Sequence, residues 1–169
     1  VHYVLDVCQG FDSQGRFNAR LGAVSSSGAA GAMHFHIHSY TLEALLEYAL
    51  VTDDDALVEL VRKGYEYGRC EGNTVLGYFP EFVNSERLEH SETCEVADMI
   101  ALGLKLSEAG VGDYWDDVDH WVRNMFAEAQ LCHTDWIDRL HLAADRLLGE
   151  QDEAAVQGIA RELTRKYGD

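Results

Sequence analysis

Basic residues, cysteine, proline and long apolar runs are all scarce in this 169-residue chain. It has 13 lysines and arginines against 30 aspartates and glutamates, which gives a formal net charge of −17. Because nucleic-acid backbones and anionic membrane surfaces are bound by clustered cations, this charge argues against both as partners. No apolar run approaches the ~18 residues of a membrane-spanning helix, so we expect no membrane span. The acidic residues are spread along the chain, which is typical of a solvated surface.

The cysteines are too few and too widely spaced for a disulfide scaffold or a zinc finger. There are four, without a CxxC pair: Cys8, Cys70, Cys94 and Cys132. We expect reduced thiols, one of them a candidate functional group. The chain begins with Val1 and shows no basic-then-apolar signal segment, and we expect a piece of a larger protein that lacks its N-terminus.

The sequence is rich in apolar stripes at the 3.6-residue period of an α-helix, and 47% of its residues are hydrophobic. Strand signals are nearly absent, so the predicted fold class is all-α. We expect a single domain made of an irregular lead-in, antiparallel helical hairpins and one loop that carries the candidate site. The expected boundaries are 1–38 for the lead-in, 39–69, 91–131 and 136–167 for the hairpins, and 70–90 for the loop.

Two details of these hairpins follow from local sequence. Thr52-Asp53-Asp54-Asp55 breaks the first helix and supplies an N-cap for the next, so the two helices pack antiparallel. In the second hairpin, Gly110-Val111-Gly112-Asp113 stops one helix and caps the next. The expected apolar stripe of that later helix comprises Trp115, Val118, Val122, Met125, Phe126 and Ala129.

The hairpins recur with a spacing of roughly 50 residues. This spacing is typical of an (α/α)6 toroid, in which the loops at one rim meet over a central cleft. We therefore expect part of such a ring. A helical repeat of the solenoid kind is the structural alternative.

The densest group of reactive side chains lies between Gly77 and Glu95, where the loop meets a helix. In a regular helix Glu92 and Cys94 would point about 200° apart, so they can share a metal only if the helix starts at or after Thr93. In the first helical turn, Cys94 would also feel the helix dipole, which lowers the pKa of a thiol. The alternative is that Cys94 packs as a small hydrophobe while Glu92 and Glu95 complement the dipole.

Glu81 follows the only proline and is flanked by aromatic side chains. Such surroundings tend to raise the pKa of a carboxyl group, which suits a general acid. Glu86 and Glu89 lie in a more polar setting. Most glycoside hydrolases need at least two carboxyl groups that face one cleft.

The run His34-Phe35-His36-Ile37-His38 presents all three histidines on one face if it is extended, whereas in a helix His36 opposes the other two. The run is a candidate for binding metal, for hydrogen bonding a sugar at the rim of a cleft, or for structural roles. Trp115, Trp121 and Trp136 are candidate sugar-stacking platforms, although helical spacing favours the core. A second candidate metal group comprises His120, Cys132 and His133.

With these motifs in their order along the chain, residues 34–106 resemble the zinc-dependent β-L-arabinofuranosidases of glycoside hydrolase family 127. The resemblance rests on the histidine run, the hairpin, the acidic loop and the Glu-Thr-Cys helix entrance. It implies an (α/α)6 barrel and a zinc ion bound by one glutamate and three cysteines, one of them the nucleophile. Glu92 and Cys94 match two of these ligands.

The same resemblance implies a catalytic acid/base in the upstream loop, with Glu81 as first choice and Glu86 as second. It implies a sugar contact from His34, with His36 and His38 as rivals. The family's remaining ligands form an adjacent Cys-Cys pair well downstream, and this chain has no such pair. The expected function is glycoside hydrolysis of a plant or microbial carbohydrate with zinc as cofactor.

Two other classes of function stay open at this point. One is a non-catalytic helical module that binds a protein or a glycan, and the other is a metal-free α/α-barrel lyase or epimerase that works through histidine and tyrosine. An incomplete toroid would expose apolar helix faces, so we also expect self-association.

Overall fold

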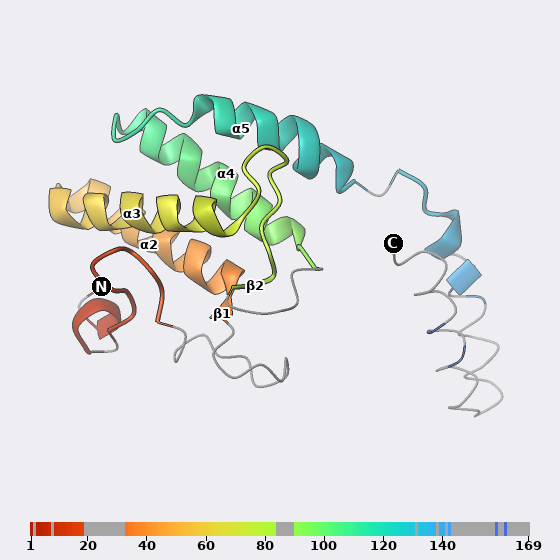
Figure 1. Ribbon diagram of the computed structural model, residues 1–169, viewed down its shortest axis with the longest axis horizontal. Helices are drawn as coiled ribbons and strands as arrows, with labels where there is room; N and C mark the ends of the chain where they lie inside the picture. The colour runs from red at the N-terminus through yellow and green to blue at the C-terminus, as the bar shows by residue number, and fades with distance from the viewer. Residues whose placement is uncertain are drawn as a thin grey trace. The chain divides into compact units, whose positions relative to one another are not determined.

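The computed structural model describes residues 1, 3–7, 9–18, 33–83, 90–130, 132–137, 139–140, 142, 158 and 161. The chain divides into two compact units, Val1–Ala129 and Gln130–Asp169. The described part is mainly helical, which confirms the coarse fold class (Figure 1). None of the described helices is both long and apolar enough to cross a bilayer.

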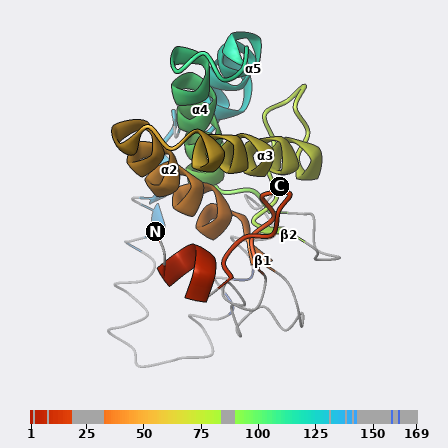
Figure 2. The same ribbon diagram turned by 90° about the vertical axis from the view of Figure 1, so that its left-hand side faces the viewer.

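The first predicted hairpin consists of α2, Phe35–Thr52, and α3, Asp55–Glu71. Between them Asp53 adopts a left-handed conformation with φ of 52°, and the Asp54 side chain accepts a 3.0 Å hydrogen bond from the backbone N–H of Leu57. The predicted N-cap is therefore confirmed. The two helices lie side by side in both ribbon views (Figures 1 and 2). Helix α2 starts at Phe35 rather than at residue 39, so two of the three histidines lie in its first turns.

Helix α4, Thr93–Glu108, packs against α2, α3 and α5. Because it has neighbours on several sides, its buried face is broad. The buried side chains of this face include Val96, Met99, Ile100, Leu102 and Leu106.

The helix predicted to run from 115 to 131 changes geometry along its length. Helix α5 is Trp115–Trp121, and residues Val122–Phe126 continue as a π-helical turn. The predicted stripe is partly wrong, because Trp115, Val122 and Phe126 are exposed. Val118 of the predicted stripe is buried, which confirms that part of it, and Trp121 joins it on the inward side of α5. The π-turn shifts the register of the residues that follow.

Trp121 is the largest fully buried side chain, so it belongs to the core and not to a sugar platform. Its Nε1–H donates to the carbonyl of Thr74 at 2.7 Å, and its ring meets Phe79 edge-on at 5.0 Å. Gly77, with φ of 76°, lies so close to the indole that a Cβ atom would clash with it. These contacts fix the loop after α3 onto α5.

Two short strands connect the lead-in to this loop. Strand β1, Met33–His34, pairs antiparallel with β2, Phe82–Val83, in the register Met33 to Val83 and His34 to Phe82. Val83 and Met33 are buried, which anchors the pair to the core. The pairing brings the start of α2 beside the loop that leads to α4.

The N-terminal lead-in folds over α2 and α3. Residues Tyr3–Val7 form a π-helical turn, and an isolated bridge joins Phe11 to Phe17. Gly15, with φ of 73°, lies against the backbone of Gly64 in α3, where no larger residue fits. Residues 19–32 of the predicted lead-in lie outside the described residues, as does most of the hairpin predicted at 136–167.

Candidate metal centre

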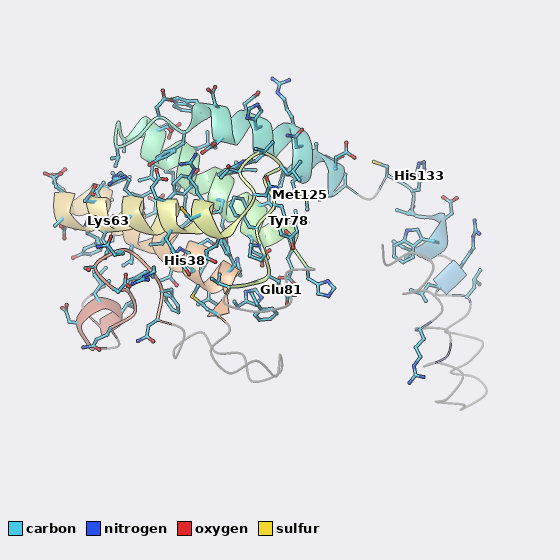
Figure 3. The ribbon with its side chains drawn as sticks, viewed as in Figure 1. His38, Lys63, Tyr78, Glu81, Met125 and His133 are labelled. Carbon is cyan, nitrogen blue, oxygen red and sulfur yellow. The ribbon has the colours of Figure 1, made fainter. Side chains whose placement is uncertain are left out.

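The candidate site lies where the β1–β2 pair meets the start of α4. Two backbone hydrogen bonds of Glu81 tie the region together: its carbonyl accepts from the N–H of Phe35 at 2.9 Å, and its N–H donates to the carbonyl of His90 at 2.8 Å. The hydroxyl of Tyr78 donates to the same His90 carbonyl at 3.2 Å. Figure 3 shows Glu81 and Tyr78 on the loop that leads to this end of the helices. The entrances of α2 and α4 are therefore held beside each other.

Glu92 and Cys94 satisfy the geometric condition for sharing a metal. Helix α4 begins at Thr93, and Glu92 is still extended, with φ of −105° and ψ of 151°. The side chains of Glu92 and Cys94 consequently project the same way. The Sγ–H of Cys94 donates to Glu92 Oε2 at 3.4 Å.

Glu95 is a member of this site that the sequence did not predict as a ligand. It forms a capping box with Glu92, whose backbone N–H donates to Glu95 Oε2 at 2.8 Å. Its side chain is fully buried, and Oε1 has no hydrogen-bond partner among the described residues. Burial raises the pKa of Glu95 to about 7, and the charge of Glu92 raises it further. The backbone hydrogen bonds that the Glu95 carboxylate accepts have the opposite effect and lower the pKa.

The predicted low pKa of Cys94 is wrong in this structure. Burial raises the pKa of the Cys94 thiol to about 12, and the neighbouring charges of Glu95 and Glu92 favour the protonated form further. These effects outweigh the helix dipole, which is equivalent to only about half an elementary charge at the helix N-terminus. A thiolate at this position therefore needs a cation nearby.

His34 and His36 have different surroundings, because the chain changes from strand to helix between them. His34 Nε2 lies 3.6 Å from Glu92 Oε2, and its Nδ1 is buried without a partner among the described residues. His36 Nδ1 lies 2.7 Å from Asp98 Oδ2, which also accepts a 2.6 Å hydrogen bond from Ser39 Oγ. His36 is the more open of the two, with 39% of its side chain exposed against 18% for His34.

His38, the third histidine of the run, is a core residue. Its side chain is fully buried, and Nε2 lies 2.9 Å from the carbonyl oxygen of Gly64. Burial lowers the pKa of His38 to about 4, against a smaller opposite effect of that hydrogen bond. His38 is thus neutral at pH 7 and is shielded from a substrate in solution.

Among the remaining candidates, Glu86 lies outside the described residues. His120 is exposed on α5 in the first unit, whereas Cys132 and His133 are exposed in the second unit. Cys70 is exposed on α3, and a groove of about 660 Å³ beside Phe11, Arg16 and Tyr67 contains none of the predicted site residues.

The arrangement brings an imidazole, two carboxylates and a thiol together at one helix entrance. One ligand atom each of His34, Glu92 and Glu95 lies within 4.8 Å of the other two, and Cys94 contacts Glu92. Nitrogen, oxygen and sulfur donors in such a group suit a transition-metal ion. Comparisons of the chain with models of protein families, with curated proteins and with solved structures find no match.

Proposed function

We propose that this chain carries a zinc-assisted glycoside hydrolase site of the β-L-arabinofuranosidase kind, which cleaves a glycosidic bond in a plant or microbial glycan. The observation that carries the proposal is the 3.4 Å contact between Cys94 Sγ and Glu92 Oε2 at the start of α4. These two residues are the ones that the resemblance to family 127 assigns to zinc. In this proposal the helical hairpins are part of an (α/α)6 ring.

The donor atoms fit the metal. Carboxylate oxygen, imidazole nitrogen and thiolate sulfur are all ordinary zinc ligands. When bound, zinc supplies Lewis-acid charge and holds a coordinating thiol in its deprotonated form. This matters for Cys94, because its surroundings otherwise keep the thiol protonated.

The proposed acid chemistry belongs to Glu81. Its backbone is fixed by Phe35 and His90 on either side, and its side chain is half-buried. In the proposed reaction the Glu81 carboxyl group donates its proton to the glycosidic oxygen as the bond between this oxygen and the anomeric carbon breaks. Water supplies the hydroxyl group that the anomeric carbon gains, and its remaining proton returns to the Glu81 carboxylate. Glu86 is the second choice for this role.

The proposed sugar contact is the exposed histidine at the start of α2. The ring of His36 is held by Asp98, so Nε2 has a fixed direction and remains available to a sugar hydroxyl. His34 faces Glu92 instead. The proposal therefore moves the main sugar contact from His34 to His36.

The test combines zinc content with hydrolysis of 4-nitrophenyl arabinofuranosides by the full chain. We expect bound zinc and release of nitrophenol for the wild type. Glu81→Gln should lower kcat by about 10²–10⁴-fold and retain zinc, because a general acid contributes about that much. Cys94→Ser should lose both zinc and activity, and Glu108→Gln, at an exposed position on α4, should behave as the wild type.

Zinc binding without turnover of any arabinofuranoside would contradict the proposed function. A metal-free lyase or epimerase is a second candidate, because the 2.7 Å contact between His36 Nδ1 and Asp98 Oδ2 directs the other ring nitrogen outward for proton transfer. Cleavage of a uronate polymer with formation of a double bond, unchanged by a chelator, would favour this candidate. Hydrolysis that a chelator abolishes would favour the zinc-assisted glycosidase.

A further inference from the structure

The ligand set of the candidate metal centre extends beyond Glu92 and Cys94. We propose that His34 from β1 and Glu95 from the first turn of α4 complete a zinc site whose four protein donors are one nitrogen, two oxygens and one sulfur. The zinc-binding role of Glu92 and Cys94 rests on the proposed function, whereas the roles of His34 and Glu95 come from their positions. Their ligand atoms and that of Glu92 lie within 4.8 Å of one another.

Helix capping alone does not account for Glu95. The third residue of a capping box needs one side-chain oxygen for the backbone N–H of the N-cap residue, and Oε2 of Glu95 fills that role at 2.8 Å. The whole side chain is nevertheless fully buried, and Oε1 has no hydrogen-bond partner among the described residues. A buried carboxylate oxygen without a donor is unfavourable, and a cation at this point would satisfy it.

His34 supplies a second unsatisfied group at the same place. Its Nδ1 is buried without a partner in the described part of the chain, and its Nε2 has only the 3.6 Å approach to Glu92 Oε2. The ring is held in place because His34 pairs with Phe82 across the two strands and meets that ring edge-on at 5.2 Å. An imidazole that is held in place and has a nitrogen without a partner is suited to bind a metal.

The charges of the cluster also favour a bound cation. Glu92 and Glu95 are adjacent through the capping box, and the Cys94 thiol lies against Glu92. No lysine or arginine is paired with Glu92 or Glu95 in the described salt bridges. Imidazole and thiol donors select zinc or a similar transition metal over magnesium and calcium, which prefer oxygen alone.

This ligand set supplies the donors that the absent Cys-Cys pair would otherwise have to provide. Because all four residues lie in β1 and at the entrance of α4, the site is local to the first unit. We therefore expect the chain to bind one zinc ion without further cysteines.

The test is a titration of the metal-free full chain with Co²⁺, followed by displacement with Zn²⁺ in the presence of a chromophoric zinc indicator. We expect visible d–d bands and a sulfur-to-cobalt charge-transfer band for the wild type. Glu95→Gln keeps a capping acceptor, because glutamine also serves in a capping box, but it removes the anionic ligand. Loss of an outer-shell partner of a metal ligand already lowers metal affinity by about 10–100-fold. Because Glu95 and His34 are proposed to bind the zinc directly, Glu95→Gln and His34→Gln should each lower zinc affinity by about 100-fold or more.

The matched control is Glu108→Gln, at an exposed position at the end of α4. It should bind zinc as the wild type does, and far-ultraviolet circular dichroism of every metal-free variant should match the wild type. Cys94→Ser should lose the charge-transfer band.

The results separate this inference from the proposed function. Wild-type zinc affinity in both Glu95→Gln and His34→Gln would overturn the inference, and the proposed function would stand if Cys94→Ser still lost zinc. The predicted loss of affinity in those two variants, together with an absence of glycoside cleavage, would support the inference and contradict the proposed function. No zinc binding by the wild type would overturn both.

Discussion

At the scale of single residues, His38 places a titratable imidazole in the core beneath the site. The rings of Phe11, Phe35 and Tyr67 lie 5.8, 5.9 and 5.5 Å from it, and Gly64 supplies the carbonyl near Nε2. Protonation would place a positive charge among these rings. His38 therefore couples the stability of the first unit to pH.

The coupling has a defined direction. The pKa of His38 is about 4 in the folded chain and near 6.5 when unfolded, so the unfolded state binds more protons between these pH values. Stability falls as the pH is lowered through this window. Between pH 7 and pH 5, we expect the free energy of unfolding of the wild type to fall by about 2 kcal/mol more than that of His38→Gln. Urea denaturation of both proteins at the two pH values measures this, and an equal pH dependence in both would contradict it.

The parts of the site that depend on residues close together in the sequence could be predicted from the sequence. Backbone geometry alone says that Glu92 and Cys94 face the same way only if the helix starts at or after Thr93. In the structure the helix starts at Thr93, so this condition is met. The burial of Glu95 was not predictable, because it depends on residues that the fold brings in from elsewhere. The spacing of Glu92 and Glu95 is a capping-box signal, but nothing in it indicates that Glu95 is buried.

At the scale of elements, the turn between α2 and α3 depends on Asp54. Replacing this N-cap by alanine leaves the N–H of Leu57 without its side-chain acceptor. We expect Asp54→Ala to lower the free energy of unfolding by about 1 kcal/mol. Urea denaturation measures the change.

The matched control for this prediction is Asp113→Ala. The sequence predicted Asp113 as the cap of the following helix, but the N-cap position of α5 is Tyr114, and it makes no side-chain capping hydrogen bond. Asp113 is exposed, so its replacement should change stability by less than about 0.5 kcal/mol. Equal losses in the two variants would show that Asp54 has no special role.

Helix periods and caps predicted most of α2, α3 and α4, because these signals are local. The strand pair was missed, since two-residue strands carry no periodic signal and form only when the loop meets the lead-in. This pair separates His34 from the other two histidines. The π-turn after α5 was missed for the same reason, because a shift of register has no clear signature in composition.

At the scale of the whole molecule, several apolar side chains remain exposed in the described part of the chain. On α2 they include Tyr40, Tyr48 and Val51, and Val51 is 82% exposed. An unpartnered apolar face is what part of a larger helical ring would leave uncovered. The toroid and the self-association stay predictions, since the described helices alone do not define a ring.

The central claim is that β1 and the entrance of α4 build one zinc centre. The most direct measurement is X-ray absorption at the zinc edge of the zinc-loaded full chain. We predict a first shell of nitrogen and oxygen scatterers with one sulfur, and the outer-shell pattern of a single imidazole. A shell dominated by several sulfur atoms, or one without sulfur and imidazole, would contradict the account.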